Sequence, residues 1–146
     1  ICSNRFLDRI LCCGERFEGV LEMSLDRFEV RVMGRRSGKT TKLQQLIEEE
    51  VTKGEDKGIA MAVTHNCLKN LTRDISKETK LSNNYSELSF RSVGANGLRY
   101  RLKGIQNIKI FFDEIYLLDD DELHNLLRLI EENRNIELIS YTSYRQ

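Results

Sequence analysis

The segment from residue 28 to residue 51 carries the pattern that most constrains the fold. Residues 28–32 alternate between apolar and charged side chains, which predicts a half-buried β-strand. The glycine-containing segment Gly34–Gly38 ends this alternation, and apolar residues at helical spacing follow over residues 43–51. A strand, a short loop and an amphipathic helix in direct succession are typical of a unit of a parallel α/β sheet.

The rest of the chain repeats the alternation of strand and helix. The continuous apolar run Ile59–Val63 is typical of a strand covered on both faces, and a helical pattern follows over residues 68–75. A second apolar run, Ile108–Phe112, precedes a helix that Asp119–Asp121 can cap, and a final strand begins at Ile136. This order predicts an α/β fold in three layers, with a mainly parallel sheet between helices.

One excursion from this order is expected between residues 88 and 102. The apolar segments Leu88–Val93 and Leu98–Leu102 flank the pair Asn96-Gly97, which is a strong hairpin-turn signal. We therefore predict a β-hairpin there.

The length of 146 residues suits a single domain of about five parallel strands. We divide it into an N-terminal helical segment over residues 1–24, where apolar residues fall at helical spacing before Gly14, and a domain over residues 25–146. Because the first residue is Ile1 rather than Met, we expect a truncated or processed form of a longer chain.

Composition limits the partners. No apolar run approaches the ~20 residues of a bilayer span, so we expect no membrane partner. Lys+Arg and Asp+Glu are equal at 23 each, so any nucleic-acid contact must come from local clusters such as Arg99, Arg101 and Lys103. The solvated face of an edge hairpin explains these three residues equally well. The four cysteines lack a CxxC spacing, which favours reduced thiols and a cytoplasmic location.

The loop Gly34-Arg35-Arg36-Ser37-Gly38-Lys39-Thr40 resembles the phosphate-binding pattern GxxxxGK[ST], although the first glycine of the pattern falls on Met33. Backbone N–H groups of such a loop surround a polyphosphate, and the helix N-terminus behind it favours negative charge. Gly38 allows a close backbone approach. Lys39 would reach the β- and γ-phosphates, and the Thr40 hydroxyl would hold Mg²⁺.

Arg35 and Arg36 are unusual inside such a loop. An arginine presents a rigid fork of donors that suits phosphate oxygens, so either residue can bridge the γ-phosphate, and a solvated loop charge is the alternative. The predicted nucleotide-binding residues are Gly34, Arg35, Arg36, Ser37, Gly38, Lys39, Thr40 and Thr41.

The apolar strand at residues 108–112 ends in two acids. Asp113 would hold Mg²⁺ together with Thr40, and Glu114 would polarise the attacking water. The alternative is a strand that runs into an acidic helix start. A final strand followed by hydroxyl residues offers Thr142 or Ser143 beside the γ-phosphate, and ordinary turn residues explain these hydroxyls nearly as well.

These motifs together resemble the ATPase domain of large terminase subunits, the motors that package DNA into viral capsids. The resemblance covers roughly residues 28–143 and rests on the following segments: the loop at residues 34–40, the strand Ile59–Val63, the region 88–102, Phe112-Asp113-Glu114 and the strand end near Thr142.

The resemblance implies a P-loop NTPase of the RecA-like, additional-strand type that hydrolyses ATP with Mg²⁺ to translocate or package double-stranded viral DNA. It implies a homo-oligomeric ring, a viral portal or other packaging subunit as partner, and the host cell cytoplasm as location. Lys39, Arg35 and Glu114 would be catalytic, and Thr142 would couple hydrolysis to motion. Two alternatives remain open: an AAA-type or helicase-like ATPase that remodels nucleic acid or protein, and an ATP-binding assembly module with little turnover.

Overall fold

A computed structural model describes residues 20–25, 27–34 and 38–143 of the chain. The helical segment predicted over residues 1–24 lies outside this part except for residues 20–24. Those residues belong to a strand, so the helix prediction is wrong for them.

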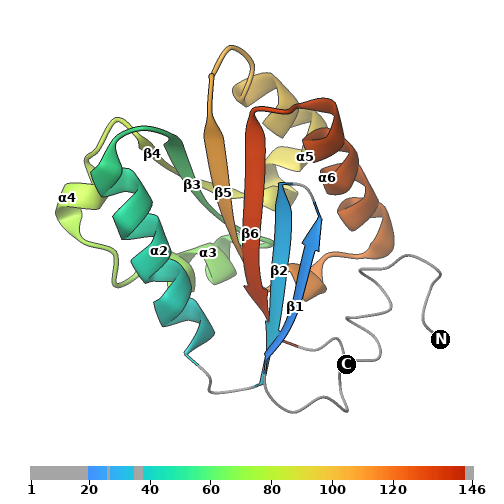
Figure 1. Ribbon diagram of the computed structural model, residues 1–146, viewed down its shortest axis with the longest axis horizontal. Helices are drawn as coiled ribbons and strands as arrows, with labels where there is room; N and C mark the ends of the chain where they lie inside the picture. Colours follow the sequence, from blue (N-terminus) through green and yellow to red (C-terminus); the bar gives the residue numbers. More distant parts are fainter. Residues whose placement is uncertain (1–19, 26, 35–37, 144–146) are drawn as a thin grey trace.

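The described residues form a six-stranded sheet in the order β1-β2-β6-β5-β3-β4 (Figure 1). In chain order the strands are β1 Val20–Leu25, β2 Phe28–Met33, β3 Lys57–Ala62, β4 Tyr85–Ser89, β5 Ile108–Asp113 and β6 Ile136–Thr142. β1 pairs antiparallel with β2, and the other five strands are parallel to one another. The carboxyl ends of these five strands therefore lie at one edge of the sheet.

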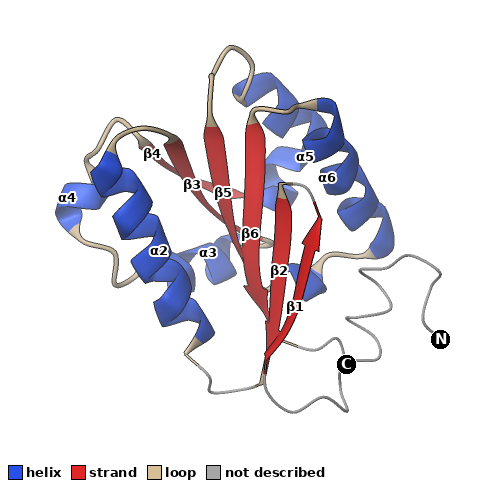
Figure 2. Cartoon of the chain, in the orientation of Figure 1, coloured by secondary structure: helices blue, strands red, loops and turns tan. Residues whose placement is uncertain are grey.

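Helices cover both faces of the sheet (Figure 2). They are α2 Lys39–Lys53, α3 His65–Thr72, α4 Lys77–Lys80, α5 Phe90–Arg101, the short 3-10 helix η2 Ile115–Leu117 and α6 Asp120–Glu132. One core lies between the sheet and α2 with α3, and the other lies between the sheet and α5 with α6. The predicted three-layer α/β architecture is thus confirmed. Within the described ranges, no helix has both the length and the apolarity to cross a bilayer.

Local features explain the character and the ends of several elements. All residues of β3 after Lys57 are buried, as expected for a strand with helices on both faces. α2 ends at Gly54, whose φ of 70° is the left-handed conformation that closes many helices. α6 begins with a capping box between Asp119 and Glu122, in which each side chain accepts from the backbone N–H of the other residue.

The predicted hairpin over residues 88–102 is wrong. β4 ends at Ser89, and the chain continues as α5, interrupted only by a non-helical Gly94 with φ of 73° and ψ of 166°. The helix forms because it buries Phe90 and Leu98 against the sheet. This burial outweighs the local turn preference of Asn96-Gly97. A Cβ on Gly97 would lie 3.0 Å from the Val93 side chain, so this glycine serves close packing within the helix.

Candidate functional site

Three of the predicted site segments meet at the carboxyl edge of the sheet. β2 leads into the loop before α2, β5 ends at Asp113, and β6 ends at Thr142 between them in space. The register pairs Val32 with Thr142 and Asp113 with Tyr141, so the three strands end at the same level. Gly34, directly after β2, and the acid pair at the end of β5 therefore lie at the same edge of the sheet, with the end of β6 between them.

A glycine in the left-handed conformation leads into α2. Gly38, the residue before the first turn of α2, has φ of 76° and ψ of 27°, a left-handed conformation that glycine adopts without penalty. No side chain of the described residues caps this helix end. The first N–H groups of α2 thus have no capping acceptor among the described side chains, and such free N–H groups are what an anion-binding helix start requires. Arg35, Arg36 and Ser37 lie outside the described residues, and their predicted roles stay predictions.

Lys39 and Glu114 form an ion pair across the edge. The Lys39 Nζ lies 3.8 Å from the Glu114 Oε1, and the two side chains are 13% and 23% exposed. The predicted phosphate-binding lysine and the predicted base therefore face the same small volume. Glu114 also has φ of 56°, which is uncommon for a residue with a side chain, and its N–H donates to the Tyr141 carbonyl at 3.1 Å.

Ser143, directly after β6, holds the Glu114 carboxylate. Its backbone N–H donates to Oε1 at 2.9 Å, and its hydroxyl donates to Oε1 at 3.3 Å and to Oε2 at 3.4 Å. Ser143 was one of the two candidate hydroxyls, and the structure brings it to the predicted base. Because these contacts come from the next strand, they fix the carboxylate relative to both β5 and β6.

The Thr142 hydroxyl lies elsewhere. Thr142 is fully buried, and its hydroxyl accepts from the Tyr116 N–H at 3.2 Å and donates to the Ser143 carbonyl at 3.3 Å. It thereby joins the end of β6 to η2, the turn that follows Glu114. The coupling role predicted for Thr142 stays a prediction, now with a defined path through this turn.

Asp113 is buried and its Oδ1 has no hydrogen-bond partner in the described part of the chain. Burial and, to a smaller extent, the negative charge of Glu114 raise the pKa of Asp113 to about 7, although the nearby Lys39 ammonium acts in the opposite direction. A buried carboxylate oxygen without a donor is a costly arrangement unless a cation compensates it. Asp113 therefore fits the Mg²⁺ role predicted for it, and the half-buried Thr40 lies at the second position of α2.

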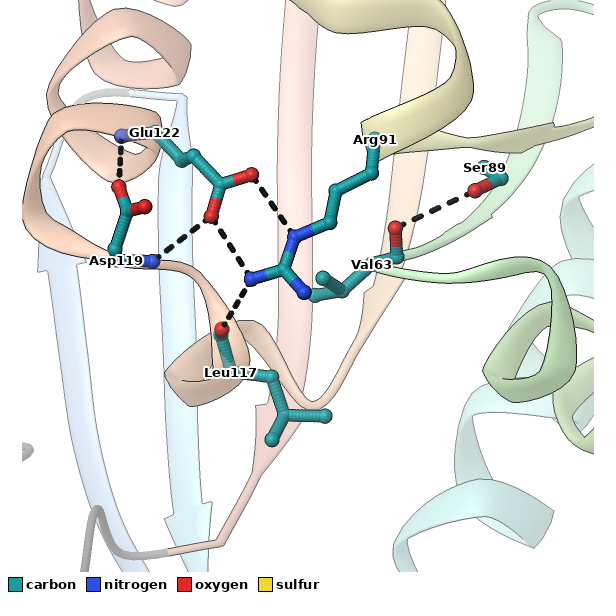
Figure 3. Close-up of polar contacts among 6 residues, drawn as sticks. All are labelled: Val63, Ser89, Arg91, Leu117, Asp119 and Glu122. Carbon is teal, nitrogen blue, oxygen red and sulfur yellow. Dashed lines mark hydrogen bonds and ion pairs between the residues drawn. The ribbon is translucent and has the colours of Figure 1, made fainter.

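A network of hydrogen bonds around Arg91 also contacts η2, the turn after Glu114 (Figure 3). The Arg91 Nε and Nη2 each lie 3.1 Å from a Glu122 carboxylate oxygen, and Nη2 also donates to the Leu117 carbonyl at 3.3 Å. These hydrogen bonds from Arg91 lower the pKa of Glu122. Arg91 thus ties α5 to η2 and to the start of α6. No sequence motif marks Arg91, which lies within the hairpin predicted over residues 88–102.

The start of α5 is also tied to the end of β3. The Ser89 hydroxyl and the Arg91 N–H both donate to the Val63 carbonyl, at 3.3 and 3.1 Å (Figure 3 draws the Ser89 contact). The segments that follow β3, β4 and β5 are therefore cross-linked at the edge where the candidate site lies.

Among models of known protein families and among curated protein sequences, none matches this chain.

Proposed function

We propose that the chain binds a nucleoside triphosphate with Mg²⁺ at the carboxyl edge of the sheet and hydrolyses it. The observation that carries the proposal is the 3.8 Å approach of the Lys39 ammonium to a Glu114 carboxylate that Ser143 also holds. A cation at the start of a helix and an oriented carboxylate on the neighbouring strands are the two groups that phosphoryl transfer to water needs.

Binding would use the loop and the first turn of α2. The N–H groups that follow Gly38 would donate to the phosphate oxygens, and Lys39 would leave Glu114 for the β- and γ-phosphates. Arg35 and Arg36 would add donors from within the loop. Mg²⁺ would be held by Asp113 and Thr40, and when bound it would neutralise charge that develops on the phosphate oxygens.

Hydrolysis would use Glu114 as the general base. A water oxygen attacks the γ-phosphorus while Glu114 takes a proton from that water, and the bond from the γ-phosphorus to the bridging oxygen breaks to leave a diphosphate and inorganic phosphate. Ser143 would keep the carboxylate in position during this step. Thr142 would pass the change at Glu114 to η2 through its bond to Tyr116.

The strand order supports the finer assignment to P-loop ATPases. β6 lies between β2, which leads into the loop, and β5, which carries the acid pair. An inserted strand at this place is the feature for which the additional-strand, RecA-like type is named. We infer this type for the chain from the order together with the loop.

For the biological use, we propose a terminase-like motor that acts on double-stranded viral DNA in the host cytoplasm. Such a motor would work as a homo-oligomeric ring against a portal or other packaging subunit. Hydrolysis stimulated by duplex DNA would support this use. Unstimulated turnover in an assembled oligomer would favour the AAA-type alternative, and tight binding without phosphate release would favour the assembly module.

Calorimetric titration with Mg·ATP tests the binding step. We expect saturable binding by the unmodified chain and none by Lys39→Ala, because the ammonium that would contact two phosphates is lost. Lys42→Ala is the matched control, since Lys42 is an exposed lysine on the same helix. Equal binding by the chain and by Lys39→Ala would contradict the proposed site.

A further inference from the structure

We propose that the groove between α5 and α6 binds the phosphodiester backbone of a nucleic acid. The proposal deepens the motor use given above, because it names the surface that would contact the polymer. It concerns the face of the sheet opposite to α2, away from the first turn of that helix.

The groove follows from the topology. α5 and α6 each begin at the carboxyl edge of the sheet and run back to the opposite edge, so they lie side by side in the same direction (Figure 1). Between them lie two adjoining cavities of about 660 and 410 Å³ that share Asn96 and Arg99 in their linings. The cavities therefore form one groove along the two helices.

Cations dominate the charged residues of the groove. Its lining includes Arg99, Arg128 and Lys103, against the single carboxylate of Glu132. Glu132 is already paired with Arg99 at 3.0 Å, and Asn96 accepts from Arg99 at 2.9 Å, so this arginine is fixed in the middle of the groove. The side chains of Arg128 and Lys103 are exposed, and neither side chain forms an ion pair or hydrogen bond with any described residue. The groove thus carries uncompensated positive charge.

The neutral groups of the lining also suit a nucleic acid. Asn96 and Asn125 offer amides, which commonly contact phosphate and sugar oxygens. Tyr100 is 82% exposed at the groove, and an exposed aromatic ring can stack on a base or pack on a sugar. Although the chain has zero net charge, this groove would therefore provide a local surface that can bind a polyanion.

An acidic protein segment fits less well. Protein interfaces have an apolar core within a polar rim. The larger cavity offers only Val93 and Ala95 as apolar side chains besides Gly94, and the rest of its lining is amide or charged. The lining of the larger cavity therefore favours phosphates over a packed helix, and the other aliphatic side chains of the groove belong to the smaller cavity: Leu102, Leu129 and Ile136.

Fluorescence anisotropy with a labelled mixed-sequence duplex of about 20 base pairs, without nucleotide and over a range of salt, tests the proposal. We expect Arg128→Glu and Lys103→Glu each to weaken binding on the order of tenfold and to reduce the salt slope by about 1. The matched controls are Arg73→Glu and Lys69→Glu, exposed cations of the α3 segment, which should bind like the unmodified chain. Circular dichroism establishes that each variant is folded.

Three results would overturn the proposal. These are no duplex or single-strand binding at low salt, equal binding by groove and control variants, and groove-dependent binding of a polyglutamate peptide in place of nucleic acid. Tyr100→Ala, compared on single-stranded and duplex probes, distinguishes stacking on bases from backbone contact alone. Since the assay contains no nucleotide, a failure of Mg·ATP binding leaves the groove result intact, and the two proposals fail separately.

Discussion

The candidate site at the carboxyl edge combines charged side chains that are paired with one carboxylate that is not. Lys39 and Glu114 compensate each other, and Ser143 supplies hydrogen bonds to the same carboxylate. Asp113, one residue earlier, keeps a buried oxygen without a donor in the described structure. A bound triphosphate with Mg²⁺ would bring anionic oxygens to Lys39 in place of Glu114 and a cation to the unpartnered oxygen of Asp113.

We expect Ser143→Ala to lower turnover several-fold and to change nucleotide affinity little. The substitution removes the hydroxyl contacts to Glu114 and keeps the backbone N–H contact, so the carboxylate is held less firmly. A hydrogen bond of this kind contributes about 1 kcal/mol. Steady-state phosphate release measures the effect, with Ser86→Ala on β4 as control. Unchanged turnover would show that the hydroxyl does not position Glu114.

The raised pKa of Asp113 gives stability a defined pH dependence. In the folded chain the pKa is about 7 against an ordinary 3.8, so between these pH values the folded state binds a proton that the unfolded state lacks. The contribution of Asp113 to the free energy of unfolding therefore falls as pH rises from about 4 to about 7 and is level above that range.

Asp113→Asn should remove this penalty. We expect the variant to gain stability relative to the unmodified chain as pH rises, by at most about 4 kcal/mol at pH 8. Urea unfolding at pH 5 and pH 8 measures the difference, with the exposed Asp74→Asn as control. A difference that does not change with pH would mean that Asp113 ionises normally. The variant should also lose any stabilisation by Mg·ATP.

At the scale of elements, sequence patterns predict most of the fold. The apolar runs at β3 and β5 and the helical spacing of α2 and α6 are strong because burial and local preference agree there. The hairpin prediction failed because Asn96-Gly97 is a local signal, whereas the burial of Phe90 and Leu98 depends on a sheet that the sequence does not display.

The sequence likewise predicts some residues of the candidate site and not others. Lys39, Asp113 and Glu114 can be predicted from the sequence, because each belongs to a short motif whose residues are neighbours in the chain. Ser143 and Thr142 were equivalent candidates, because a shift of one residue at a strand end decides which hydroxyl reaches Glu114. Arg91 carried no signal, since its contacts with Glu122 and Leu117 join three elements far apart in the sequence.

The loop before α2 offers a prediction at this scale. Gly38→Ala should destabilise the chain by about 1–2 kcal/mol, because an alanine is strained at φ of 76°. Gly34→Ala is the matched control, because a Cβ there would meet no atom of the other described residues within 4 Å and the φ of Gly34 is not in the left-handed region. Thermal unfolding compares the two. Equal losses would contradict the left-handed start of α2.

At the scale of the whole molecule, the candidate nucleotide site and the cationic groove occupy different places. The candidate nucleotide site lies at the carboxyl edge, where α2 begins, and the cationic groove lies between the helices of one face. Arg91 links them, because it belongs to α5 and contacts the turn that follows Glu114. A change at Glu114 therefore has a direct covalent and hydrogen-bonded route to a helix that lines the groove.

Single-turnover hydrolysis of Mg·ATP by the unmodified chain, Glu114→Gln and Glu131→Gln tests whether Glu114 is the general base of a hydrolytic site. Glu131 is an exposed glutamate of α6 and serves as the matched control. We expect Glu114→Gln to bind Mg·ATP normally and to release phosphate about 10²- to 10⁴-fold more slowly, because the general base is lost. Glu131→Gln should hydrolyse at the unmodified rate. Phosphate release by Glu114→Gln at that same rate would show that Glu114 is not the general base.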